Sequence, residues 1–150
     1  MTYTDALRHH VERSLRGDLD IRRPEPDGDG DYGPHAVGTA PVWVRSLFEH
    51  DPPLVRVWAA AARSVKKSAA LLKELNELNI GLQQIRCLYV NRTVVVSCEA
   101  EIESIEPGQL GRLVNRVGTT SEHVGQLIAA MYGGERVTLV DSDTLPVSRE

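Results

Sequence analysis

The sequence is poor in aromatic residues and lacks any run of like charge. Aromatic residues make up 5% of its 150 residues, so a core must come mainly from Val, Leu, Ile and Ala. The net charge is −4, and the densest basic stretch holds only Arg63, Lys66 and Lys67. Binding to nucleic acid requires a clustered basic patch that neutralises phosphates. We therefore expect no nucleic-acid partner.

The sequence also lacks long apolar segments and has few cysteines. No segment approaches the ~20 apolar residues that a membrane helix requires, and the first residues show no basic-then-apolar signal pattern. We therefore expect no membrane partner and a cytoplasmic location. Cys87 and Cys98 have no C-x-x-C or Cys/His spacing typical of a metal site. They fit reduced core residues in a reducing compartment.

Motifs for catalysis are missing as well. There is no G-x-S-x-G, Walker or G-x-G-x-x-G motif, and the five histidines lack a chelating spacing. Asp27, Asp29 and Asp31 suggest a calcium loop, but an EF-hand needs Gly at its sixth position and Glu at its twelfth. Tyr32 and Gly38 stand there instead. We expect a flexible acidic turn, and predict no catalytic residue, no metal and no cofactor.

What the sequence does contain is a clear series of helix and strand patterns. Apolar residues four apart predict a helix from Tyr3 to about Gly17, and apolar repeats after Pro107 predict a long last helix that ends at Gly133. The elements predicted between them are a short strand over 18–23, an acidic Pro/Gly-rich loop over 24–34, strands over 35–48 and 54–61, a helix over 63–79, and strands over 83–90 and 93–102. Residues 137–140 indicate a short strand at most, followed by disorder.

The first predicted hairpin supplies the candidate binding residues. With Asp51-Pro52 as the centre of the turn, Phe48 pairs with Val55, and one face of the hairpin is apolar and points inward. The candidate protein-binding residues share the opposite face: Trp43, Arg45, Leu47, Arg56 and Trp58. Both tryptophans lie there one diagonal step apart, and large aromatic residues are enriched at interface hot spots. Two alternatives stay open, namely that a helix covers this face so that both tryptophans are core, or that the face forms a homodimer contact.

The second predicted hairpin has a tight turn at Asn91-Arg92, with Val90 opposite Thr93. This register puts the two cysteines on the inner face as diagonal neighbours, a poor geometry for a disulfide. A row of carboxylates, from Glu99, Glu101 and Glu103, then lies on the outer face. We interpret that row as a solvated surface.

The order of the elements, together with the text Leu72-Lys73-Glu74-Leu75-Asn76-Glu77-Leu78-Asn79 and the strand and helix that follow it, resembles the YbjN-like family. That family shares the fold of the type III secretion chaperones. The resemblance spans about Met1 to Gly134. It implies a small, often dimeric, non-catalytic bacterial protein that holds extended client segments or acts as a sensory transduction regulator, and it transfers no catalytic residue. The acidic loop over 24–34 has no counterpart in the family pattern.

The sequence therefore predicts an α+β fold, an antiparallel sheet with the order α-β-β-β-α-β-β-α like that of the type III secretion chaperones. We expect one domain over 1–134, with helices mainly on one face of the sheet, and a partly disordered tail over 135–150. The leading hypothesis is a chaperone-like module that binds a protein or peptide client. Alternatives are a regulatory homodimer without a client, through the wide apolar stripe of the 63–79 helix, and a small-molecule binder.

Overall fold

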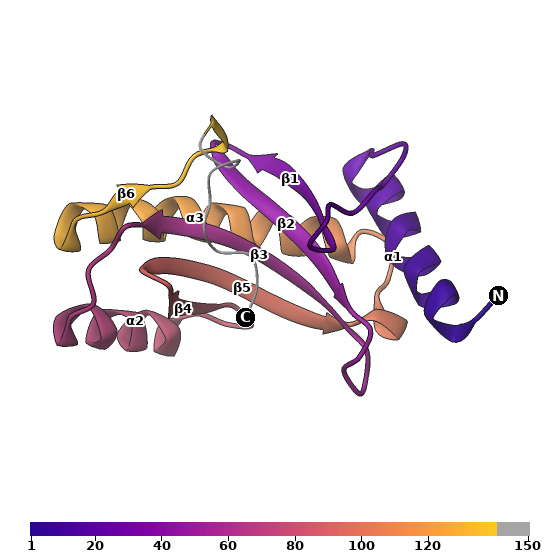
Figure 1. Cartoon of the computed structure of the whole chain (residues 1–150), viewed down its shortest axis with the longest axis horizontal. Coiled ribbons are helices and arrows are strands. Elements are labelled where there is room, and N and C mark those ends of the chain that lie inside the picture. The colour runs from indigo at the N-terminus through magenta and orange to yellow at the C-terminus, as the bar shows by residue number, and fades with distance from the viewer. Residues whose placement is uncertain (141–150) are drawn as a thin grey trace.

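The computed structural model describes residues 1–140 (Figure 1). Its elements in chain order are α1 (Tyr3–Leu19), β1 (Asp31–Val37), β2 (Ala40–Leu47), β3 (Leu54–Arg63), α2 (Ala69–Gly81), β4 (Arg86–Val90), β5 (Thr93–Glu101), the short 3₁₀ helix η1 (Ile102–Ser104), α3 (Gln109–Tyr132) and β6 (Glu135–Arg136). The strands form an antiparallel sheet in the order β1-β2-β3-β5-β4, and β6 pairs with β3. The predicted α+β fold class is confirmed.

The three strands between the first two helices are not the three that were predicted. No strand forms over 18–23, because α1 continues through Leu19 and ends where Asp20 adopts a left-handed conformation. The single strand predicted over 35–48 is two strands, β1 and β2, which a turn at Gly38-Thr39 connects. Gly38 has a φ of +59°, which glycine adopts without steric cost. The end of the predicted acidic loop is therefore the start of β1.

The two predicted hairpins differ in how well their registers were predicted. Val90 faces Thr93 as expected, and both turn residues, Asn91 and Arg92, have positive φ. In the hairpin of β2 and β3, Val55 faces Ser46 rather than Phe48. The last pair is Leu47 with Leu54, so residues 48–53 form a longer connection than predicted. Because the error is two residues, each side chain stays on its predicted face.

The main core lies between one face of the sheet, here called the inner face, and the helices. Figure 1 shows α3 behind the strands, and α3 contacts β1, β2, β3 and β5, while α2 contacts β4. Glycines let α3 approach the sheet closely: a Cβ on Gly125 would lie 2.5 Å from the carbonyl oxygen of Ala61. Cys87 and Cys98 are buried free thiols in this core, and burial raises the pKa of each to about 11.

Of the remaining boundaries, the end of the last helix agrees with the prediction, whereas the start of the second helix and the strand in the tail differ. The last helix ends before Gly133, as predicted. The second helix begins at Ala69, capped by the hydroxyl of Ser68, rather than near residue 63, because β3 extends to Arg63. The tail pairs with β3 at residues 135–136 rather than forming a strand over 137–140. The prediction of disorder at the end of the chain concerns residues 141–150, which lie outside the described residues.

Candidate binding face

The candidate site lies on the sheet face opposite the main core, here called the outer face. Strand alternation places Trp43, Arg45 and Leu47 of β2 on this face, beside Arg56 and Trp58 of β3. The structure thus brings all five predicted residues together. Four of them are buried, and only Arg56 is half-buried. The outer face is therefore closed around the tryptophans.

The two tryptophans face each other directly across β2 and β3 rather than diagonally. Their rings stack with centroids 4.6 Å apart and planes 18° from parallel, and they are 7% and 6% exposed. Their apolar cluster adds Ala60, Val95 and Val137, and no residue from the three helices. The structure thus supports the alternative in which both tryptophans are core residues. Within residues 1–140, however, the residue from outside the sheet that packs in their cluster is Val137, and not a residue of a helix.

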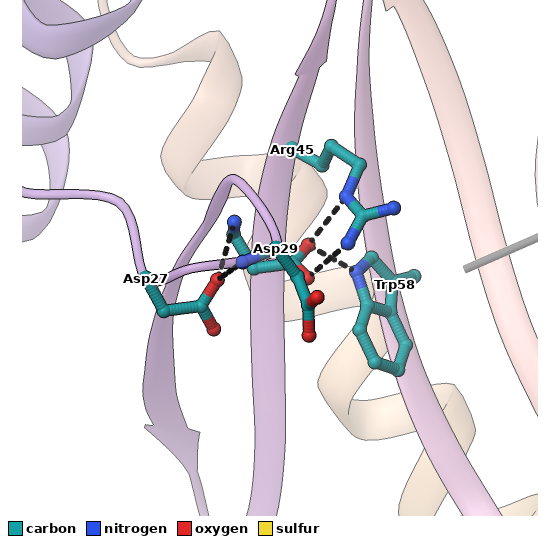
Figure 2. A network of polar contacts seen from close by, with 5 residues as sticks. Asp27, Asp29, Arg45 and Trp58 are labelled. Carbon is teal, nitrogen blue, oxygen red and sulfur yellow. Dashed lines mark hydrogen bonds and ion pairs between the residues drawn. The ribbon is translucent and has the colours of Figure 1, made fainter. Parts of the chain in front are cut away.

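The buried carboxylate of Asp31 accepts hydrogen bonds from Arg45 and Trp58, whose side chains Figure 2 labels at the polar end of this cluster. Arg45 donates Nε to Asp31 Oδ1 at 3.1 Å and Nη2 to Oδ2 at 2.6 Å, and Trp58 donates Nε1 to Oδ1 at 2.9 Å. Asp31 is 3% exposed. Burial raises the pKa of Asp31, while the hydrogen bonds from Arg45 and Trp58 act in the opposite direction. The network links β1, β2 and β3 into one rigid unit.

The acidic loop has a defined conformation that its own aspartates create. Asp27 Oδ1 accepts the backbone N–H of Asp29 at 2.9 Å and of Asp31 at 3.0 Å, and Figure 2 shows this turn next to the network. Such side-chain-to-backbone bonds are typical of Asx turns. Within residues 1–140, no three His, Cys, Asp or Glu side chains converge as metal ligands would. The aspartates thus order the loop and position Asp31.

The other half of the outer face, over β3, β5 and β4, is more open. Arg56 donates Nε and Nη2 to Glu99 Oε2 at 2.8 and 2.5 Å, and Arg86 Nη2 lies 3.5 Å from the same oxygen. Half-buried Leu54 and Leu88 flank this group on the same face. The predicted row of carboxylates on β5 holds Glu99 and Glu101 only, because Glu103 belongs to η1.

A further polar contact closes the edge of the sheet at β4. The side chain of Asn79, on α2, donates Nδ2 to the carbonyl oxygen of Cys87 at 3.0 Å and accepts its N–H at 2.6 Å. Sequence reasoning noted Asn79 only as part of a family motif and missed this role. It also missed Asp31, which it assigned to a loop. An arginine at a buried strand position needs a carboxylate partner. The position of Arg45 in a strand was therefore the one feature of the sequence that could have indicated a nearby buried aspartate.

Comparisons with known proteins agree with this architecture. A sequence profile of the family "T3SS (YopN, CesT) and YbjN peptide-binding chaperone 1" matches residues 5–139. The crystal structure of YbjN from E. coli superposes with a TM-score of 0.51 at 15% identity, covering 91% of this chain and 96% of that chain. No curated protein shows a significant sequence match. Among residues 1–140, every helix is too short or too polar to cross a bilayer.

Proposed function

Since the chain belongs to the T3SS and YbjN peptide-binding chaperone family, we propose that it is a non-catalytic, chaperone-like module that binds a peptide or protein client on its outer sheet face. The proposed site is centred on the five residues predicted from the sequence: Trp43, Arg45, Leu47, Arg56 and Trp58. The buried four form the rigid floor. Arg56 and its neighbours on β5 and β4 make the direct contacts.

The observation that carries this proposal is the difference between the two sheet faces. The inner face is covered by α2 and α3, whereas the apolar cluster of the outer face contains no helical residue. Its open half combines half-buried leucines with an Arg–Glu–Arg group, which supplies apolar area and charges of both signs. A preorganised surface of this kind suits an extended segment, because little ordering entropy is lost on the protein side.

The setting that we propose is cytoplasmic, with a regulatory role. Two free thiols whose pKa is raised by burial are stable in a reducing compartment and are poor nucleophiles.

The second function that an observation favours is a homodimer. On α2, Ile80 is 78% exposed and Leu72 is 41% exposed, and large exposed apolar side chains on one helix favour self-association.

Selection of peptides from a random displayed library against the purified protein tests the proposal. We expect enriched peptides to bind the wild type and to bind Leu88→Glu at least about tenfold more weakly, since a buried unpaired charge on the open half costs more than 1 kcal/mol. Leu72→Glu is the matched control, because it places the same charge on α2. It should leave peptide affinity unchanged and should dissociate a dimer in sedimentation analysis. Failure to enrich any peptide, or equal affinity for Leu88→Glu, would contradict the site.

A further inference from the structure

A concave surface lies away from the outer face, where the end of α1, strand β1 and the start of α3 meet. Here it is called the α1–β1–α3 groove. Its main hollow has a volume of about 960 Å³ and is lined by residues of all three elements, including Asp18, His35 and Arg112. A hollow of about 280 Å³ adjoins it at His35, and one of about 300 Å³ adjoins it at Asp18. The three hollows are therefore contiguous, and together they have room for several side chains of a ligand.

Each hollow contributes one arginine. Arg112 lines the main hollow, Arg23 the hollow of about 280 Å³ and Arg13 the hollow of about 300 Å³. None of the three has an ion-pair partner among residues 1–140. The chain as a whole carries a net charge of −4, so these three unpaired cations form a local positive region on an acidic protein. A negatively charged ligand would supply the missing partners.

The acidic groups of the groove do not take this role. Asp18 accepts the backbone N–H of Gly108 at 2.9 Å and of Gly111 at 3.1 Å. Its carboxylate thus caps the start of α3 and already accepts two of the backbone N–H groups there. Glu25 lines only the hollow of about 280 Å³. A ligand anion would therefore be held by the arginine side chains.

A neutral polar group completes the main hollow. His35 Nε2 is buried and has no hydrogen-bond partner within the described chain, and burial lowers the pKa of His35. A neutral imidazole can donate or accept one hydrogen bond at this nitrogen, and buried polar atoms in native proteins usually find a partner. The exposed amide of Asn115 lies in the same lining. The hollow therefore offers a cation together with neutral polar groups.

We propose that the α1–β1–α3 groove is a subsite for a segment of the client other than the one on the outer face: this segment places an acidic side chain, Asp or Glu, against Arg112, and Arg13 and Arg23 receive its further acidic residues. This inference rests on the proposed peptide-binding function and specifies the chemistry of the client. Three arginines in adjoining hollows match a chain of residues better than a single small anion, which could engage only one hollow at a time.

Fluorescence anisotropy with short, C-terminally amidated peptides tests the subsite. The probes are a Glu/Leu/Ser peptide, the same peptide with every Glu replaced by Gln, and a version with phosphoserine instead of Glu. We expect wild-type protein to bind the Glu peptide about tenfold more tightly than the Gln peptide, as for a hydrogen bond to a charged group. Arg112→Gln should reduce this preference, since only Arg13 and Arg23 then remain to bind acidic side chains. Lys73→Gln, which deletes an exposed charge on α2, is the control and should keep it.

Three results would overturn the subsite: equal affinity for the Glu and Gln peptides, an undiminished Glu preference in Arg112→Gln, or binding of the phosphoserine peptide alone. The display-selected peptides separate this failure from that of the proposed function. If they bind wild-type protein and depend on Leu88 while no Glu preference exists, only the subsite is wrong. If no peptide of either origin binds, both proposals are wrong. Thermal melting of Arg112→Gln checks the fold, and we expect an unchanged melting temperature because Arg112 is exposed.

Discussion

The two halves of the outer face contain the same kind of ion pair in different surroundings. Arg45 pairs with Asp31 at 2.6 Å, and Arg56 pairs with Glu99 at 2.5 Å. The Asp31 side chain is 4% exposed, whereas the Glu99 side chain is 23% exposed and has a second cation nearby. The first pair therefore fixes the sheet where water is excluded, whereas water reaches and screens the second pair.

The largest expected effect comes from removing the buried carboxylate charge. Asp31→Asn keeps the size of the side chain but removes the buried negative charge that Arg45 Nε and Nη2 contact, and breaking a buried ion pair from one side costs about 3–5 kcal/mol. Urea denaturation followed by circular dichroism measures the loss in the free energy of unfolding. If Asp31→Asn were no more destabilising than Glu99→Gln, the proposed contrast between the two halves would be wrong.

A smaller loss is expected when only the indole donor is removed. Trp58→Phe retains an aromatic ring in the stack but deletes the N–H that reaches Asp31 Oδ1, and we expect a loss of about 1–3 kcal/mol. Trp43→Phe is the matched control, because it reduces the same stack without touching Asp31. The same denaturation experiment should therefore show a larger loss for Trp58→Phe than for Trp43→Phe, and the reverse order would argue against the network.

The smallest effect belongs to the open half. Glu99→Gln should cost about 0.2–1 kcal/mol, as is typical of ion pairs that water reaches. The difference from wild type should shrink as salt is added, because exposed charges are screened. Comparing denaturation midpoints at low and high salt checks this. A loss that does not respond to salt would place Glu99 with the buried half.

The sequence was most informative where short connections fix the geometry. The two-residue turn Asn91-Arg92 leaves one register for its hairpin, and that register was predicted to the residue. The connection over 48–53 allows several registers, and the prediction there was wrong by two. The prediction that the five residues share one face was nevertheless correct, because the face of a side chain depends only on the alternation along each strand.

Other features of the site depend on contacts between distant parts of the chain. The tryptophans are buried in a cluster with Val137, which lies far along the sequence from both. Arg45 is paired by a residue of β1 that the Pro/Gly-rich text assigned to a loop. Neither the local pattern nor the propensity of single residues reports such contacts. The groove between α1, β1 and α3 was invisible for the same reason.

The amide of Asn79 has a consequence for the behaviour of the protein at high concentration. The free edge of a sheet is a template on which strands of other molecules can add, and this is a common start of fibril growth. Asn79 presents to Cys87 the donor and acceptor that an incoming strand would present, so that position of β4 is already occupied. In this member of a peptide-binding chaperone family, the contact would limit polymerisation through β4.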